Sequence, residues 1–519
     1  MLAPGGAVFV APLIALVAGT LSGPQPSDDA FITLRYARSL AAGEGFVFNP
    51  GERVLGTTTP LFALTLAALH LLTAVDFVWL AFWLALGAHI WVTGLMTRIG
   101  MRCELTLVAC TAAVLYALAP IAFAPTAACM ETALFVALTL SVLAPVVFSE
   151  RLWWPHVAAA LAILLRPEGV LVAAVHVARV ARVSKRAALQ AAGTVSAVIL
   201  PWIAFAAWYF RNPVPQSLLV KWGGRWVFVR VAESLMNVVV ALPLALPMAR
   251  VETFELLPFG STVAKELPGC FAVGTRRLAV LVIGAACVIV VAAGAVRMMR
   301  RNSSMRWLFL FVVVYAGAYG IARPAIFPWY LVPLLPALLL AFVSGCTAVI
   351  DRLVPSPVWA WRVSAGGAVC LIACAVMQYR ALLHSFPDGR EVGYRRAVQL
   401  LGAAAQDPTI SIGALEIGAI GYYSHARIID HFGLVTPDAV RLGTMATVNR
   451  YKPDYYIGQR LLFYMLGFYA TPEFGEEYEL TTRVPGSRPG AAQTFVYARR
   501  VPPHAADAAT TAPKSAPMP

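Results

Sequence analysis

Long apolar runs separated by short polar segments fill the chain from residue 5 to about residue 379. The runs predict helices over 5–21, 60–75, 77–97, 105–124, 132–148, 153–165, 168–178, 188–210, 234–249, 278–296, 307–322, 329–350 and 358–379. A perpendicular membrane span needs about 20 apolar residues, and several runs are shorter. We therefore expect half-helices or interfacial helices at 60–75, 153–165, 168–178 and 234–249.

Beyond residue 379 the pattern changes to short apolar stretches interrupted by Gly, Asp and Pro. "TISIG" and "TFVYARR" predict strands, and "GYRRAVQLLGAAA" predicts an amphipathic helix. The pattern divides the chain into a mainly α-helical membrane domain (1–379, about 11–13 apolar segments), a small α/β domain (380–500) and an Ala/Pro-rich tail (501–519) that we expect to be disordered.

Composition agrees with a polytopic membrane protein. Of the 519 residues, 60% are hydrophobic and 13% are charged, against about 25% charged in an average soluble protein. The net charge of +14 comes from short basic clusters between apolar runs, without interleaved aromatic residues, so no nucleic-acid partner is expected. No cysteine follows Cys374 and no CxxC spacing occurs, which argues against a disulfide framework or a cysteine metal site in the 380–500 domain.

Basic clusters predict the orientation of the bundle. The clusters at 179–186, 297–306 and 97–102 are predicted to be cytoplasmic. If 60–75 does not fully cross, the remaining loops lie on the outer face, namely 22–58, 125–131, 211–232, 250–277 and 323–328. The 380–500 domain then also lies outside the cytoplasm.

An acidic pair, Asp28 and Asp29, stands in the first outer loop (22–58) directly before a stretch that predicts an amphipathic helix suited to the membrane interface. One interpretation is helix capping, in which carboxylates meet the positive end of the helix. One aspartate would suffice for a cap, so a chemical role for the pair stays open.

Charged residues near a membrane bundle are costly, and each is a functional hypothesis. Those on the predicted outer loops are Asp28, Asp29, Arg35, Glu131, Lys221, Arg225 and Arg323, and Arg166 and Glu168 lie between two half-length runs. Carboxylates mixed with cations suit a site that deprotonates a hydroxyl and holds a phosphate.

Simpler interpretations stay open for these residues. Glu131 would pair with a loop arginine, Arg166 would pair with Glu168, and Lys221 would contact lipid headgroups. Tyr330 next to Trp329 would stack on a sugar or belong to an aromatic membrane belt. In the 380–500 domain, Glu416, Asp430 and His431 would contact an acceptor or serve as turn and cap residues.

Several sequence elements, in order, resemble the family-C (GT-C fold) membrane glycosyltransferases, which include protein O-mannosyltransferases, the lipid A aminoarabinose transferase and actinobacterial arabinofuranosyltransferases. The first spans Asp28 to Leu61, "DDAFITLRYARSLAAGEGFVFNPGERVLGTTTPL". The others are "CMETALFVALTL" (129–140), "LLRPEGVLVA" (164–173), "NPVPQSLLVKW" (212–222), "FPWYLVPLLP" (327–336) and "EIGAIGYYSHARIIDHFGLVTPD" (416–438). The fourth has Gln216-Ser217 where the family usually has Asn-Thr.

The resemblance implies a multi-pass enzyme of a bacterial plasma membrane that moves a sugar from a polyprenyl-phosphate donor to an extracytoplasmic glycan, lipid or protein. By position in the first element, Asp28 would be the general base, and Asp29 would orient it, raise its basicity or bind acceptor. Lys221, Arg323 or Arg166 would meet the phosphate, and Glu131 would hold a sugar hydroxyl. No nucleotide-sugar motif is present, no cofactor is assigned, and the use of a divalent cation stays open.

Two other functions fit the pattern less closely. A lipid or sugar transporter would also place charges inside a bundle, but it predicts paired broken helices in both halves, and only the first half has the Arg-Pro-Glu-Gly break. A ligase of surface glycans would move an oligosaccharide instead of one sugar, and sequence pattern separates it poorly from the first function.

Overall fold

The computed structural model describes residues 4–144, 153–222, 273–322, 327–386, 389–486 and 493–500. The chain forms two compact units. The first unit comprises Met1–Val47 and Leu55–Phe386, and the C-terminal unit comprises Phe48–Val54 and Pro387–Pro519. Residues 48–54, which belong to the first outer loop by sequence, thus group with the C-terminal unit. The predicted helix at 234–249 and the 501–519 tail lie outside the described residues.

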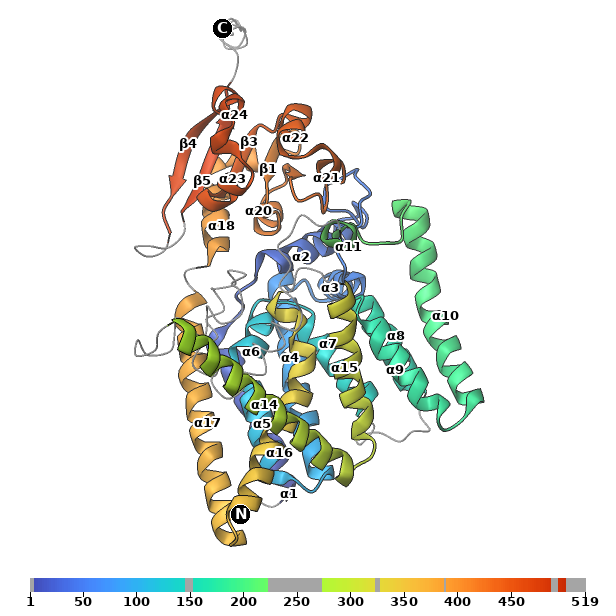
Figure 1. The fold of residues 1–519 in the computed structure, drawn as a ribbon. Coiled ribbons are helices and arrows are strands. Elements are labelled where there is room, and N and C mark those ends of the chain that lie inside the picture. The colour runs from blue at the N-terminus through green and yellow to red at the C-terminus, as the bar shows by residue number, and fades with distance from the viewer. Residues whose placement is uncertain are drawn as a thin grey trace, which may run out of the picture. The chain divides into compact units, whose positions relative to one another are not determined.

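In the described residues of the first unit every regular element is a helix, as the apolar pattern predicts (Figure 1). Its helices are α1 (Pro4–Ser22), α2 (Asp28–Ala41), α3 (Pro60–Thr73), α4 (Phe77–Arg102), α5 (Thr106–Leu118), α6 (Pro120–Ala127), α7 (Thr132–Leu143), α8 (Trp154–Leu165), α9 (Gly169–Ala181), α10 (Lys185–Phe210), α11 (Gln216–Trp222), α14 (Val273–Arg301), α15 (Met305–Ala322), the 3₁₀ helices η2 (Pro328–Tyr330) and η3 (Val332–Leu334), α16 (Leu335–Leu353) and α17 (Pro357–Ser385).

By length and composition, four helical stretches in the described residues can cross a membrane, and a fifth does so if α5 and α6 act as one bent span. The four are Phe77–Arg102, Lys185–Phe210, Pro328–Leu353 and Pro357–Leu401. Shorter apolar helices accompany them, among them α3 with 14 residues. At 1.5 Å per residue α3 extends about 21 Å, less than the hydrocarbon core of about 30 Å.

Prolines mark two breaks between helices, one inside a predicted run and one between two predicted runs. The run at 105–124 splits at Ala119, whose extended backbone (φ −60°, ψ 122°) precedes Pro120, and α5 and α6 meet at a bend of 49°. Likewise, α8 ends where Arg166 adopts φ −154° and ψ 140° before Pro167. The proline ring disfavours the helical conformation at the preceding residue, and at Ala119 and Arg166 the chain leaves that conformation and the helix ends.

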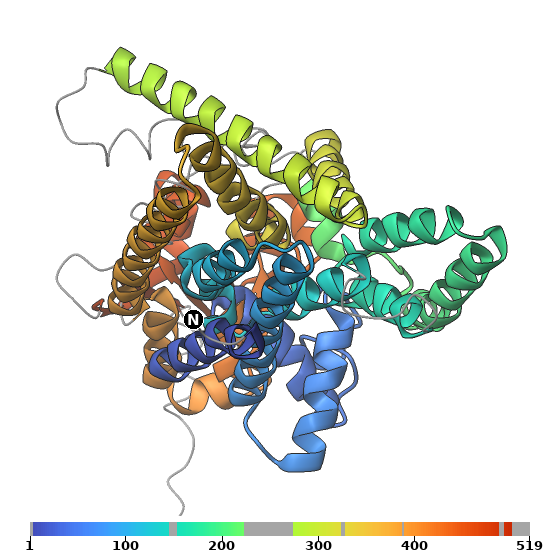
Figure 2. The same ribbon diagram turned by 90° about the horizontal axis from the view of Figure 1, so that it is seen from below.

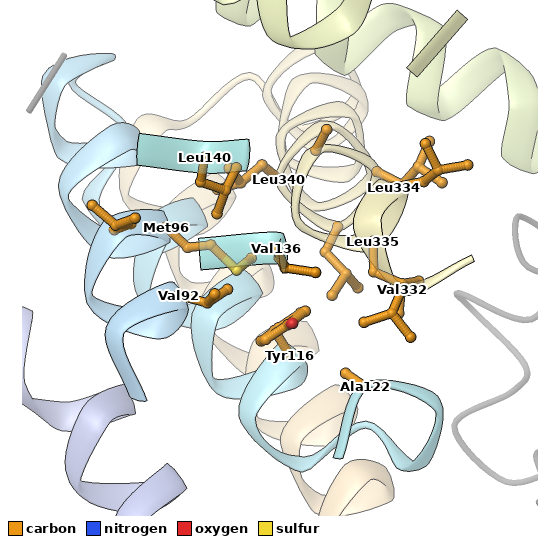
Figure 3. Packing of buried hydrophobic residues seen from close by; sticks show 14 of the residues in the cluster. Val92, Met96, Tyr116, Ala122, Val136, Leu140, Val332, Leu334, Leu335 and Leu340 are labelled. Atoms are coloured by element: carbon orange, nitrogen blue, oxygen red, sulfur yellow. The ribbon is translucent and has the colours of Figure 1, made fainter. Parts of the chain in front are cut away.

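Small and apolar side chains hold the bundle together. Figure 3 shows Met96, Tyr116, Val136 and Leu340 in the packed interior between α4, α5, α7 and α16. Each of these four residues is at least 99% buried. Helices α14 and α16 lie side by side in Figures 1 and 2 and cross so closely that a Cβ added to Gly345 would lie 2.0 Å from the carbonyl oxygen of Val290. Close backbone approach of this kind is how helices associate in lipid, where apolar burial gives no driving force between them.

The C-terminal unit contains a small mixed sheet, which confirms the expected sheet region. Its strands are β1 (Ser411–Ala414), β2 (Arg427–Asp430), β3 (Tyr455–Gln459), β4 (Tyr478–Val484) and β5 (Thr494–Arg499), in the order β2-β1-β3-β5-β4. Strands β2, β1 and β3 are parallel, whereas β5 is antiparallel to both β3 and β4. Its helices are α18 (Arg390–Leu401), α19 (Ala403–Gln406), α20 (Gly418–Tyr423), α21 (Asp438–Leu442), α22 (Thr444–Tyr451), α23 (Arg460–Met465), η5 (Phe468–Ala470) and α24 (Pro472–Glu477).

Candidate functional site

The two aspartates of the acidic pair have different surroundings. Ser27 is the N-cap of α2, and its hydroxyl accepts a hydrogen bond from the backbone N–H of Ala30 (3.3 Å). Capping therefore falls to Ser27, and both aspartates occupy the first helical turn. Asp28 is buried, with 5% of its surface exposed, whereas Asp29 is exposed.

Helix α2 is enclosed more fully than an interfacial helix would be. Ten of its 14 residues are buried, including Arg35, which is 1% exposed. Burial, with repulsion from Arg38, lowers the pKa of the Arg35 guanidinium to about 9. Arg35 is therefore enclosed within the protein and does not form an exposed polar face of this helix.

Backbone pairing brings the acidic pair close to the "CMET" element. The N–H of Gln25 donates to the carbonyl of Ala127 (2.7 Å), and the N–H of Ser27 donates to that of Ala128 (3.3 Å). The chain then turns at Cys129, which has a positive φ of 61°, and reaches Glu131 at the start of α7. Two acidic elements about 100 residues apart in sequence are therefore joined by adjacent backbone segments.

A buried ionic cluster is centred on Arg166. Its Nη1 lies 2.8 Å from Oε1 of Glu131, and its Nη2 lies 3.1 Å from Oε1 of Glu168. Nη1 also reaches the hydroxyl of Thr132 (3.4 Å), and the hydroxyl of Tyr319 donates to Glu168. The Arg166 and Glu131 side chains are 5% and 8% exposed, so solvent screens these pairs little.

Aromatic rings line the same cluster. The Arg166 guanidinium carbon lies 5.0 Å from the ring centroid of Tyr330 and 5.9 Å from that of Phe135. The hydroxyl of Tyr315 donates to the backbone carbonyl of Tyr330 (2.7 Å), and the Tyr315 and Tyr319 rings stack with centroids 4.8 Å apart. The cation–π contact and the tyrosine hydrogen bonds add to the ion pairs that hold Arg166 in place.

The structure thus unites four residues proposed from sequence as substrate contacts: Glu131, Arg166, Glu168 and Tyr330. The pairings that the simpler interpretations require, Glu131 with an arginine and Arg166 with Glu168, are present. Two carboxylates face one guanidinium, and Nε of Arg166 and Oε2 of Glu168 are buried without a hydrogen-bond partner among the described residues. Nη1 and Nη2 of Arg166 both bind carboxylates, which favours a structural role, and the unpartnered Nε is the remaining donor group.

The other two cation candidates are less defined. Lys221 belongs to α11, whose first residue, Gln216, donates its N–H to the carbonyl of Leu55 (2.8 Å) in the first outer loop. Its helix is therefore tied to the same loop as Asp28. Arg323 lies outside the described residues.

Sequence reasoning missed Tyr315 and Tyr319. They stand four residues apart on α15, so one helix face presents both rings to the cluster. That spacing was the available signal. Sequence reasoning also missed a triangle of hydroxyls formed by Thr33, Thr57 and Thr59, whose oxygens lie 3.0–3.2 Å apart. These hydrogen bonds connect α2 to the start of α3.

In the C-terminal unit, Asp430 and His431 have structural partners. The Asp430 carboxylate accepts the N–H groups of Phe432 (2.7 Å) and Val435 (3.0 Å), which orders the turn after β2. Burial raises the pKa of Asp430 to about 6, against the pull of these donors. The His431 Nε2 lies 3.0 Å from the hydroxyl of Tyr456, and burial lowers the pKa of the imidazole to about 4. The Asp430 contacts match the turn interpretation, whereas His431 is a buried residue bonded to Tyr456 on β3.

Glu416 is also paired, with the Arg390 guanidinium (2.8 Å) and the hydroxyl of Tyr394. Across the described ranges of both units, no group of three or more His, Cys, Asp and Glu side chains is placed to hold a metal ion.

Comparison with known proteins identifies the fold. Residues 381–502 match a family model described as a domain of unknown function (DUF8728). No curated protein matches the chain. Among solved structures, the chain is similar to the Archaeoglobus fulgidus oligosaccharyltransferase tethered with an acceptor peptide, with 11% identity and a TM-score of 0.55 over 96% of this chain and 74% of that one.

It is also similar to ArnT from Cupriavidus metallidurans bound to undecaprenyl phosphate, with 13% identity and a TM-score of 0.55 over 94% of this chain and 97% of that one. The chain therefore has the GT-C fold of membrane glycosyltransferases, as the order of its sequence elements predicts.

Proposed function

We propose that this protein is an integral-membrane glycosyltransferase that moves a sugar from a polyprenyl-phosphate donor to an acceptor outside the cytoplasm, which is a cell-envelope glycan, a glycolipid or a protein. Two similar structures support this class, since one holds undecaprenyl phosphate and the other an acceptor peptide. The observation that carries the proposal is the buried carboxylate of Asp28 in the first turn of α2, one residue beyond the backbone pairing with Ala128.

In this proposal Asp28 is the general base. The acceptor hydroxyl oxygen attacks the anomeric carbon, the bond from that carbon to the phosphate oxygen breaks, and the hydroxyl proton passes to Asp28. Polyprenyl phosphate leaves as an anion and needs no general acid. A single displacement inverts the anomeric configuration, so one carboxylate suffices, unlike in hydrolases with paired carboxylates.

Cations complete the proposed site because charge grows on the leaving phosphate. Lys221 is the first candidate, since α11 is bonded to the loop that follows α2, and Arg323 is the second. We assign Arg166 to a different task, because Glu131 and Glu168 already bind it. It holds these carboxylates and the ring of Tyr330 as a rigid wall for the sugar.

The direct test is Asp28→Asn in membranes supplied with radiolabelled polyprenyl-phosphate sugar. Loss of the base should lower transfer by about 10²–10⁴-fold. The matched control is Asp76→Asn, the same change at the exposed N-cap of α4, where Asp76 accepts the N–H of Val78 (2.9 Å). Asparagine caps helices as well as aspartate does, so this variant should keep full activity.

Asp29→Asn separates the two members of the pair. Asp29 is exposed, so its loss should change the rate by less than about tenfold. Undiminished transfer by Asp28→Asn at equal expression would reject Asp28 as the base. Movement of labelled lipid across the membrane without sugar transfer would replace the proposal with a transporter.

A further inference from the structure

The tip of the loop between α2 and α3 is built into the C-terminal unit. The side-chain amide of Asn49 donates to the carbonyl of Ile428 (2.9 Å) and accepts its N–H (3.0 Å). Ile428 lies on β2, at the edge of the sheet. Asn49 therefore satisfies both backbone groups of an edge-strand residue, as a neighbouring strand would.

A second residue of the tip strengthens this attachment. Oε1 of Glu52 binds the Arg427 guanidinium through Nε (2.6 Å) and Nη2 (2.5 Å), and Oε2 accepts from the Asn49 amide (2.9 Å). Asn49 is 2% exposed and its neighbour Phe48 is 1% exposed. The tip is thus a buried, hydrogen-bonded part of the C-terminal unit.

Both flanks of the tip are bound to the first unit. On one side, the Phe46 ring lies 5.3 Å from that of Tyr36 on α2 and 6.0 Å from that of Phe210 on α10. On the other side, Leu55 accepts the N–H of Gln216 on α11 (2.8 Å), and Gly56 donates its N–H to the Tyr36 hydroxyl (2.8 Å).

Asn49 is three residues from Phe46 and six from Leu55. Three extended residues span at most about 10 Å, so any larger displacement of the tip must be taken up by the contacts of Phe46. Tension on the tip must act on the contacts with α2 and α11.

We propose that Asn49 is a positioning residue, through which the C-terminal unit holds the helices that carry Asp28 and Lys221. Glu52 supports it by fixing its amide and by binding Arg427. The inference rests on the proposed function for its effect on sugar transfer, but the mechanical link is independent of that function.

The test is hydrogen exchange on the full chain in nanodiscs, with Asn49→Ala and the milder Glu52→Gln. If the link holds, exchange should rise at least fivefold at the amides of Gly56 and Gln216 in the first unit, and to a smaller degree in Glu52→Gln. Asn449→Ala, an exposed asparagine on α22 of the C-terminal unit, is the matched control and should match the unmodified protein.

Transfer kinetics supply the second readout. Misplacement of the base should lower kcat about tenfold in Asn49→Ala while the KM for the lipid donor changes less than twofold. Faster exchange confined to Arg427–Asp430, with Gly56 and Gln216 as protected as before, would overturn the inference. Faster exchange at Gly56 in a protein whose unmodified form transfers no sugar would support the link and reject the proposed function.

Discussion

Removal of the Arg166 guanidinium tests the buried cluster most directly. Arg166 forms ion pairs with Glu131 and Glu168, with N–O distances of 2.8 and 3.1 Å. The two glutamate side chains are 8% and 12% exposed. At an effective dielectric constant of about 20, each pair contributes about 5–6 kcal/mol of Coulomb attraction. The cost of removing these charges from water offsets much of that attraction while the cluster is intact. Once Arg166 is lost, the desolvation cost of the two carboxylates is no longer compensated.

Arg166→Met should therefore lower the free energy of unfolding by about 3–5 kcal/mol, because two buried carboxylates then face each other without a cation. A triple variant that carries Glu131→Gln, Arg166→Met and Glu168→Gln together should recover much of this stability, because no buried charge of the cluster is left unpaired. The control is Arg297→Met on α14. Arg297 pairs with Asp351 at the same 2.8 Å, but these side chains are 24% and 48% exposed, so the loss should be about 1 kcal/mol.

The assay is equilibrium unfolding in mixed detergent and SDS micelles, followed by tryptophan fluorescence. The reasoning fails if Arg166→Met costs no more than Arg297→Met, or if the triple variant is less stable than Arg166→Met alone. The first result would mean that water reaches the cluster. The second would mean that hydrogen-bond geometry, and not charge, dominates there.

Two further predictions concern packing and pH. Gly345→Ala should destabilise the bundle by about 1–3 kcal/mol in the same unfolding assay, because its Cβ would lie 2.0 Å from the Val290 carbonyl oxygen, whereas Gly366→Ala on α17, with nothing within 4 Å, should be neutral or slightly stabilising. In the C-terminal unit, burial lowers the pKa of His431 to about 4 from an unfolded value of about 6.5, so stability is complete above pH 6.5 and falls as the pH drops toward 4. This titration alone should lower the opening free energy from hydrogen exchange by about 2 kcal/mol between pH 7 and pH 5, while the neighbouring Asp430, whose pKa burial raises to about 6, acts in the opposite direction over the same range. His431→Gln, compared at each pH, should lack the His431 part of the slope, and an equal slope in both proteins would contradict the assignment.

The helices could be predicted because their determinants are local. Runs of apolar residues correspond closely to α4, α10, α14, α16 and α17, and the first-turn position of Asp28 follows from Ser27 and the amphipathic stretch beyond it. The kinks at Pro120 and Pro167 also have a local cause, since each proline restricts the residue before it. The order of short elements along the chain was enough to indicate the GT-C fold.

Other features depend on contacts between distant residues. Arg166 meets Glu131 across 35 positions, Tyr319 meets Glu168 across 151, and Asn49 meets Ile428 across 379. No local periodicity encodes such pairs, because each depends on how whole helices and strands pack. Sequence by itself determined where helices and strands form and that carboxylates and cations gather on particular loops. Only the tertiary structure decided that Asp28 is buried while Asp29 is not, that two carboxylates bind Arg166, and that the tip of the first loop belongs to the C-terminal unit. Burial and pairing of a charge depend on its complete surroundings, which exist only in the folded chain.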